Sequence, residues 1–253
     1  MFQDTNICII LCFNAEKTIE IFLKRIFQIR FENKIDFLVL DDSSIDNTIN
    51  IVKNYISTNN LSNLKYEVNI KNLGFGGNLK KAYDLAIKGK YKYLSILHGD
   101  GQYPPEFLDE MYHRLSRSNL VLGSRMIHKK NALKGKMPII RFAGNIILTN
   151  FQNLFFKQKL SEWHTGFRGL DLKILEEIPY NMNSNYFDID TQILLQFIIR
   201  MKKISEFPIP TYYDQEKSGV NLIKYGLSVV FEMILAKLTV LKILKIKRYE
   251  IEK

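Results

Sequence analysis

The sequence predicts an α/β fold in which helices cover both faces of a mostly parallel sheet. Within the first 125 residues, short apolar runs alternate five times with segments that repeat apolar residues at helical spacing. The chain has 253 residues, of which 46% are hydrophobic and 25% charged, as in an ordinary globular domain. We therefore expect one domain over residues 1–225, followed by an amphipathic, basic C-terminal helix over residues 226–253.

Five short apolar runs in the first half are expected to form strands buried on both faces of the sheet. They span residues 7–13, 36–42, 64–70, 92–97 and 119–125. Helical spacing places helices between them, at residues 16–29, 43–56, 78–90 and 104–115. Ser43 and Asp46 are suited to cap the second of these helices, and Pro104 and Pro105 to open the fourth.

The second half of the chain is less regular. Apolar residues predict helices over residues 137–156 and 186–202. Between them, residues 161–171 are expected to form a loop and a short strand. Residues 204–213 are expected to form an edge strand, because a central strand does not tolerate the two prolines found there.

The bulk charge restricts the partners of the protein. The formal net charge of +10 favours an anionic partner, such as nucleic acid, an acidic membrane face or a phosphate-bearing substrate. The basic residues are dispersed and no nucleic-acid-binding motif is present, so we expect no nucleic-acid partner. Cys8 and Cys12 lie four residues apart on one strand, about 13 Å, which excludes a disulfide and suits a reducing compartment.

Polar residues follow the apolar runs at the point where each predicted strand ends. They are Asn14, Asp41, Asp42, the segment NLGFGG at residues 72–77, the segment 98–102, Ser124 and Arg125. In an open parallel sheet, ligands bind at the carboxyl ends of the strands, so these residues are expected to meet on one rim.

Two of these strand ends suit a nucleotide. Asp41 and Asp42 can accept hydrogen bonds from a base or a ribose, whereas Ser43 and Asp46 fit helix capping better. Gly74 and Gly76, in the segment NLGFGG, can present backbone N–H groups to a phosphate. A plain glycine turn explains that segment equally well.

The segment HGDGQ suits a divalent cation. Asp100 and Gln102 offer oxygen ligands for Mg²⁺ or Mn²⁺, and His98 could add a nitrogen ligand, which favours Mn²⁺. Such a cation would bridge the phosphates of a nucleotide and stabilise a leaving diphosphate. The alternative is an acidic turn held by Pro104 and Pro105.

The motifs taken in order resemble those of a known family. FNAE, LDDSSIDNT, NLGFGGN, HGDGQYPPE, GSR, HTGFRG and FDID resemble a family 2 glycosyltransferase of the Rossmann-like GT-A fold. The closest branch is the dolichol- or polyprenyl-phosphate sugar synthases. The resemblance extends from Ile7 to about Tyr225.

The resemblance implies a role for individual residues. Phe13, Glu16 and Asp42 would line a nucleoside pocket, and Asp100 would hold the metal with support from Gln102. Arg125 and Arg168 would contact phosphate, and Asp190 would lie near the acceptor. The chain departs from the family pattern at His98, where the first acid of an Asp-x-Asp motif is usual, and at Glu162, where an Asp often stands. The proline that usually precedes Asn14 is also absent.

The implied activity is an inverting, metal-dependent transfer of a hexose from a UDP- or GDP-linked sugar to polyprenyl phosphate. One alternative acceptor is a sugar hydroxyl of a surface polysaccharide, which would need Asp190 or Asp188 as a base. Asp188 fits a helix N-cap better, and His164 is left without a role. A weaker alternative, suggested by His98, is a non-catalytic module that binds a nucleotide sugar or a membrane.

The two most apolar helices indicate contact with lipid or protein. On the C-terminal helix, Ser228, Glu232, Thr239 and Lys242 form a narrow polar stripe, and Lys245, Lys247 and Arg248 follow at its end. This pattern fits a helix at an anionic lipid surface, or one packed on the domain or a second subunit. The segment Ile139–Phe156 is similar. With no run of about 18 uncharged apolar residues, we expect a cytoplasmic protein attached peripherally to the inner face of the plasma membrane, with a homodimer as the alternative.

Overall fold

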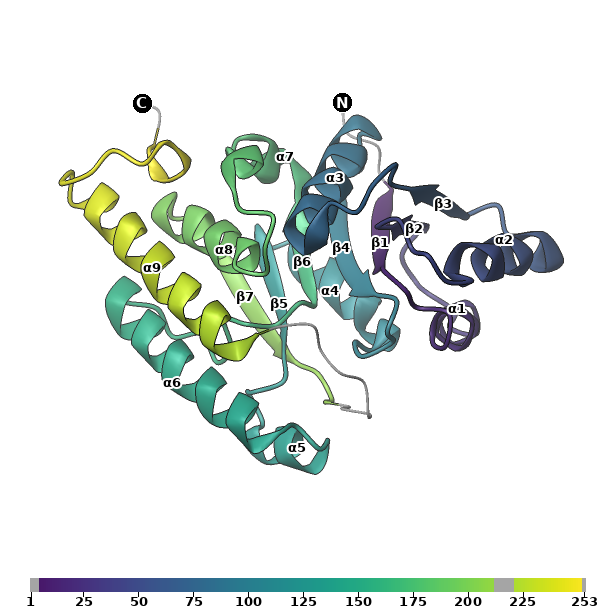
Figure 1. Ribbon diagram of the computed structural model, residues 1–253, viewed down its shortest axis with the longest axis horizontal. Coiled ribbons are helices and arrows are strands. Elements are labelled where there is room, and N and C mark those ends of the chain that lie inside the picture. Colours follow the sequence, from purple (N-terminus) through teal and green to yellow (C-terminus); the bar gives the residue numbers. More distant parts are fainter. Residues whose placement is uncertain (1–4, 212–220, 252–253) are drawn as a thin grey trace.

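The computed structural model describes residues 5–211 and 221–251 and contains one seven-stranded sheet in the order β3-β2-β1-β4-β6-β5-β7 (Figure 1). The strands are β1 Asn6–Cys12, β2 Ile35–Asp41, β3 Leu64–Val68, β4 Tyr93–His98, β5 Leu120–Ser124, β6 Arg168–Asp171 and β7 Ile204–Pro208. The α/β fold and the mostly parallel sheet predicted from the sequence are therefore confirmed.

The α-helices that pack around this sheet are α1 Ile19–Phe27, α2 Thr48–Asn59, α3 Gly74–Lys88, α4 Leu108–Leu115, α5 Lys129–Lys134, α6 Ile139–Phe156, α7 Leu172–Glu176, α8 Ile189–Ile199 and α9 Leu222–Val240. Most lie within a few residues of the predicted ranges. α5 and α7 have no counterpart in the prediction.

Strand direction departs from parallel at one position. β6 is antiparallel to both of its neighbours, β4 and β5, whereas β1 pairs in parallel with β2 and β4, and β5 with β7. β7 lies at the edge, as its prolines predict, with Pro208 opposite Ser124.

Alternating residues of β1, an interior strand, define the two layers. In β1, Ile7, Ile9 and Leu11 pack in one hydrophobic cluster with residues of α3 and α8. Cys8, Ile10 and Cys12 pack in the other cluster, with residues of α1 and α4. The two cysteines are buried and unbridged, as expected for a strand with both faces covered.

The start of α3 differs from the prediction. The glycine segment was expected to be a loop before the helix, but α3 begins at Gly74 and includes Gly76 in its first turn. Gly74 has a φ of +73°, which glycine adopts without strain. A Cβ on Gly76 would come within 2.5 Å of the Ser184 carbonyl oxygen. The glycines therefore permit close packing between α3 and the 184–185 segment.

The C-terminal helix also has other bounds than predicted. α9 begins at Leu222 and ends at Val240, and Lys242 then adopts a φ of +60°. The chain turns back into a short 3₁₀ turn, Lys247–Tyr249, whose Tyr249 hydroxyl donates to Glu232 of α9 at 2.6 Å. The chain therefore folds back after α9, and Tyr249 is buried there.

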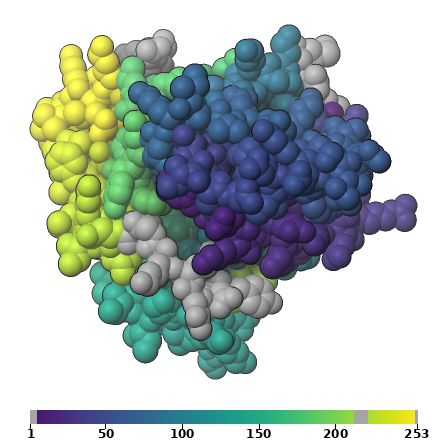
Figure 2. All heavy atoms as spheres, turned by 45° about the vertical axis from the view of Figure 1, so that its right-hand side comes forward, coloured from purple at the N-terminus to yellow at the C-terminus, as the bar shows by residue number. Residues whose placement is uncertain are grey.

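α6 and α9 lie side by side at one end of the molecule and contact each other (Figure 1). Figure 2 shows the yellow C-terminal residues on the side opposite to the purple N-terminal ones. Within the two described ranges, no helix is both long and apolar enough to cross a bilayer.

Candidate active site

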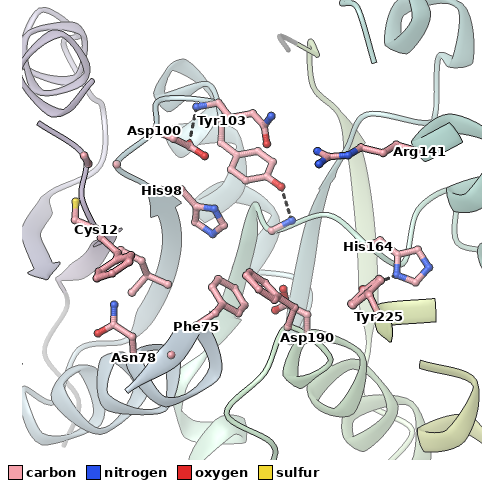
Figure 3. A pocket seen from close by; sticks show the side chains of 18 of the residues that line it. Cys12, Phe75, Asn78, His98, Asp100, Tyr103, Arg141, His164, Asp190 and Tyr225 are labelled. Carbon is pink, nitrogen blue, oxygen red and sulfur yellow. Dashed lines mark hydrogen bonds between the residues drawn. The ribbon is translucent and has the colours of Figure 1, made fainter. Parts of the chain in front are cut away.

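A cleft of about 1200 Å³ opens at the carboxyl ends of β1, β2, β4 and β5 (Figure 3). One side, here called the N-terminal wall, includes Phe13, Asn14, Asp42, Phe75, Asn78 and the segment 98–103. The other side, the C-terminal wall, includes Arg125, Arg141, Leu148, His164, Asp190 and Tyr225. The rim predicted from the strand ends is thus one half of a larger cleft, which α6, α8 and α9 complete.

Asp42 and Phe13 border the N-terminal wall, where the resemblance placed a nucleoside. Asp42 is buried, and its Oδ1 accepts from Asn69 Nδ2 at 2.7 Å and from the N–H of Leu73 at 2.8 Å. These bonds fix the carboxylate against the loop before α3. Phe13 is 53% exposed, so its ring is accessible to a planar ligand.

Asp41 and Glu16 do not border the cleft, contrary to prediction. Asp41 is fully buried, and its carboxylate accepts from the N–H of Ser44 at 2.8 Å and from the Ser44 hydroxyl at 2.5 Å. Glu16 is exposed and accepts from the N–H of Asn47 at 3.1 Å. Both carboxylates accept backbone N–H groups of the loop that follows β2, so they fix the shape of that loop.

The predicted phosphate-binding glycines use their N–H groups within the protein. The N–H of Gly74 donates to Asn72 Oδ1 at 3.0 Å, and that of Gly76 donates to the Asn185 carbonyl at 2.9 Å. The alternative explanation, a turn that packs closely, is the one that the structure supports. Gly74 still borders the cleft through its backbone.

The HGDGQ segment begins at the last residue of β4 and forms the centre of the cleft (Figure 3). Asp100 is exposed, and its Oδ1 accepts from the N–H of Gln102 at 3.0 Å. The His98 ring packs edge-on against Phe75 and Tyr103, with centroids 5.7 and 5.2 Å apart. Its Nε2 is buried and has no hydrogen-bond partner among the described residues.

His98, Asp100 and Gln102 all border the cleft, but they do not form a closed metal site. Among residues 5–211 and 221–251, no three His, Cys, Asp or Glu side chains gather closely enough to hold an ion. One exposed carboxylate with an amide beside it fits a cation that takes its other ligands from phosphate and water, as Mg²⁺ commonly does.

Arg168 does not border the cleft, contrary to prediction. Its guanidinium is 2% exposed and donates to three backbone carbonyls, those of Thr165 at 2.8 Å, Trp163 at 2.8 Å and Asp190 at 2.6 Å. Its Nε also lies 3.4 Å from Asp190 Oδ1. Arg168 therefore positions Asp190 and the 163–165 loop.

Asp190 projects from the first turn of α8 to the floor of the cleft (Figure 3). Burial raises the pKa of its carboxyl, while the charges of Arg168 and His98 oppose that rise. Asp188 occupies the N-cap position of α8, as predicted, but its side chain makes no capping bond and accepts the Ser184 hydroxyl instead.

Arg125 borders the C-terminal wall and is balanced by a buried acid. Its N–H donates to Glu162 Oε2 at 2.7 Å and its Nε to Oε1 at 3.0 Å. Glu162 is fully buried and also accepts from Asn145 Nδ2 at 2.8 Å. The guanidinium lies 5.8 Å from the centre of the Tyr103 ring. Arg125 is thus a fixed donor whose charge is largely compensated.

Three residues of the C-terminal wall were not assigned a role from the sequence. Arg141 of α6 directs its guanidinium into the cleft (Figure 3). The hydroxyl of Tyr225, in α9, lies 2.8 Å from Nδ1 of His164. Burial, together with the charges of Arg168 and Arg125, lowers the pKa of His164 to about 3. The only sequence signal for Arg141 was a cation at the start of an apolar helix.

The order of these elements and the position of the cleft can be compared with known proteins. A sequence model of glycosyl transferase family 2 matches residues 7–179, which include β1 through α7 and the whole HGDGQ segment. The chain belongs to glycosyl transferase family 2. It is a glycosyltransferase, and the matched range contains the N-terminal wall together with Arg125 and Arg141.

Relatives and solved structures extend the likeness to nearly the whole chain. Two proteins of Methanocaldococcus jannaschii, uncharacterized proteins MJ1222 and MJ0544, are 25% and 27% identical over 93% and 90% of this chain and 93% and 97% of their own lengths. Glucosyl-3-phosphoglycerate synthase from Mycobacterium tuberculosis, crystallised with uridine diphosphate, has a TM-score of 0.69 at 14% identity, covering 96% of this chain and 82% of that one. This family 2 chain therefore has the GT-A-like fold that the resemblance implied.

Proposed function

We propose that the protein is an inverting, metal-dependent glycosyltransferase that moves a hexose from a UDP- or GDP-linked sugar to polyprenyl phosphate. The observation that carries the proposal is the composition of the C-terminal wall. Arg141 and His164 border it beside the apolar side chains of Ile140, Leu148, Leu222 and Ile223. A cation surrounded by apolar groups suits a phosphate attached to a hydrocarbon chain.

The donor would lie along the N-terminal wall. Phe13 and Asp42 would contact the nucleoside, and Asp100 with Gln102 would support a Mg²⁺ or Mn²⁺ ion on the diphosphate. Crystal structures of the Mycobacterium tuberculosis synthase contain Mn²⁺ or Mg²⁺ with uridine diphosphate, in a fold that this chain shares. The bound cation would stabilise charge on the departing diphosphate.

The residues of the C-terminal wall would orient the acceptor phosphate. A phosphate oxygen is already anionic near neutral pH, so it can attack the sugar without a protein base. Arg141 would hold the phosphate, and Arg125 would contribute a fixed N–H donor. Asp190, held through its backbone and carboxylate by Arg168, would keep the nucleophile on the face opposite the diphosphate.

A sugar hydroxyl is the second candidate acceptor, and one observation favours it. A hydroxyl must lose its proton, and burial raises the pKa of Asp190 toward the range in which a carboxylate is an effective base. In that reaction Asp190 would accept the proton as the new glycosidic bond forms.

Partition of the product distinguishes these acceptors. We would incubate the protein with Mn²⁺, undecaprenyl phosphate and radiolabelled UDP-glucose or GDP-mannose, and then extract with organic solvent. Label in the organic phase is the expected result. The contrary result is labelled product that stays in the aqueous phase and forms only when a glycan fraction or phosphoglyceric acid is supplied. That result would identify the acceptor as a hydroxyl or a small phosphate compound and would contradict the lipid proposal.

A further inference from the structure

α6 turns polar side chains inward. Its buried residues are Asn145, Thr149 and Gln152. On the opposite side of the helix, Ile140 is 75% exposed, Ile147 67% and Leu154 79%. A helix on the surface of a soluble domain usually buries its apolar side chains and exposes its polar ones. α6 does the reverse.

α9 also buries two residues of its polar stripe, Glu232 and Thr239. Glu232 is the one acid between residues 221 and 248, and it is buried, where it accepts from Arg248 at 2.8 Å and from the Tyr249 hydroxyl at 2.6 Å. Thr239 is buried as well. Ile223, Leu227 and Phe231 follow one another at four-residue spacing and are 59–78% exposed.

The two helices present these side chains at the same end of the molecule (Figure 1). α6 and α9 contact each other, and Lys237 of α9 donates to the Phe155 carbonyl of α6 at 3.0 Å. Their exposed apolar residues include Ile140, Ile147, Leu154, Ile223, Leu227 and Phe231; these six define the docking face. So many large apolar side chains exposed on two adjacent helices indicate an interaction site.

The positive charge of the chain is concentrated in the two segments that contain α6 and α9. Residues 126–160 contain seven Lys and Arg and no acid, and residues 221–248 contain six with one acid. Together they hold 13 of the 36 basic residues and one of the 26 acids, so the rest of the chain has a net charge of −2. The whole positive excess therefore belongs to the two segments that form the docking face and its margins.

We propose that the docking face lies on an anionic lipid bilayer, with α6 and α9 in the plane of the interface. Apolar side chains would enter the acyl boundary, and the surrounding lysines would contact acidic headgroups. Two copies of this face pressed together would oppose two strongly basic surfaces, which charge repulsion disfavours. Charge complementarity thus selects acidic lipid over a second copy of the chain.

With α6 and α9 in the plane of the interface, the cleft would lie next to the membrane. Ile140 and Ile223 belong both to the docking face and to the wall of the cleft, near the first turns of α6 and α9. If the acceptor is the lipid phosphate proposed above, it could enter without leaving the bilayer surface. The docking itself does not depend on that acceptor.

Co-sedimentation of the full chain with vesicles tests the proposal. We would compare phosphatidylcholine vesicles with vesicles that contain a third phosphatidylglycerol. The test variant is Ile147→Ser/Leu154→Ser/Leu227→Ser/Phe231→Ser, whose sites do not border the cleft. The matched control is Ile21→Ser/Ile45→Ser/Ile70→Ser/Met201→Ser, because these residues are at least as exposed but lie elsewhere. Thermal melting would verify that each variant is folded.

We expect wild type and control to bind the acidic vesicles alike. The test variant should need a lipid concentration at least about tenfold higher for half of the protein to bind. Substituting Lys129→Gln/Lys130→Gln should weaken binding to acidic vesicles more than Lys88→Gln/Lys90→Gln. Wild type that stays in the supernatant, or equal losses in test and control variants, would overturn the proposal. If wild type does not bind vesicles but forms a dimer, and only the test substitutions disrupt that dimer, the face would be assigned to a second copy of the chain instead.

Discussion

Nε of Arg168 lies 3.4 Å from Oδ1 of Asp190, while Nη1 of the same guanidinium donates to the Asp190 backbone carbonyl at 2.6 Å. This pair joins the start of β6 to the first turn of α8. It places a carboxyl of raised pKa at the floor of the cleft and keeps the arginine itself out of it. Because Asp190 borders the cleft and Arg168 does not, the aspartate is the member of the pair that can contact a substrate.

Replacing Arg168 with Met is expected to destabilise the protein by about 3 kcal/mol or more, because three backbone carbonyls lose a buried donor and the partly buried Asp190 carboxyl loses its ion-pair partner. Denaturant unfolding measures this loss. Arg25→Met is the control: Arg25 pairs with Glu106 at 2.6 Å on the surface, so its removal should cost about 1 kcal/mol or less. If the Arg168 variant had normal stability but a raised KM for the acceptor, Arg168 would be assigned to phosphate binding after all.

The sheet and its rim could be predicted from the sequence because both depend on local pattern. Apolar runs bounded by polar residues identify buried strands, and parallel strands bring their carboxyl ends together. Asp42, His98 and Asp100 border the cleft for that reason. The direction of β6 was not predictable, because a four-residue strand carries no signal for its pairing.

The other half of the cleft depends on tertiary contacts that sequence pattern does not encode. Arg141 and Tyr225 approach the site only because α6 and α9 pack against each other. The polar stripe of α9 was recognised, but whether Glu232 faces solvent or protein depends on Arg248 and Tyr249 folding back onto it. The role of Arg168 was misjudged because a cation in a loop can face inward as well as outward.

Asp100→Ala is expected to lower turnover by about a hundredfold or more while the melting temperature stays the same. The carboxylate is exposed and accepts a backbone N–H at 3.0 Å, so little of the fold depends on it. Donor turnover at several Mn²⁺ concentrations measures the effect. Glu16→Ala, at an exposed acid outside the cleft, should leave turnover and donor KM unchanged. Similar losses in both variants would contradict the assignment of Asp100 to the cation.

Gly76→Ala is expected to destabilise the protein by about 1–3 kcal/mol, because the new Cβ would meet the backbone of the 184–185 segment within 2.5 Å. Urea unfolding provides the measurement. Gly226→Ala is the matched control in α9, where no atom lies within 4 Å of the added Cβ. There a gain of about 0.5–1 kcal/mol is expected from helix propensity. A loss at Gly226 equal to that at Gly76 would show that close packing is not the cause.

His164 gives a prediction for the pH dependence of stability. Its folded-state pKa is lowered to about 3 from the model-peptide value of 6.5, mainly by burial. Below pH 6.5 the unfolded chain therefore binds a proton at His164 that the folded chain does not, so stability falls as the pH falls from 6.5 toward 3. At pH 5 this loss amounts to about 2 kcal/mol.

His164→Asn removes the titrating group while leaving an amide near the position of Nδ1, within reach of the Tyr225 hydroxyl. Unfolding free energies measured at pH 7 and pH 5 should therefore differ less in this variant than in wild type, by about 2 kcal/mol. His113→Asn, at an exposed position on α4, should keep the wild-type difference. An unchanged difference in His164→Asn would mean that the imidazole is protonated in the folded protein, where it would add a cation to the C-terminal wall.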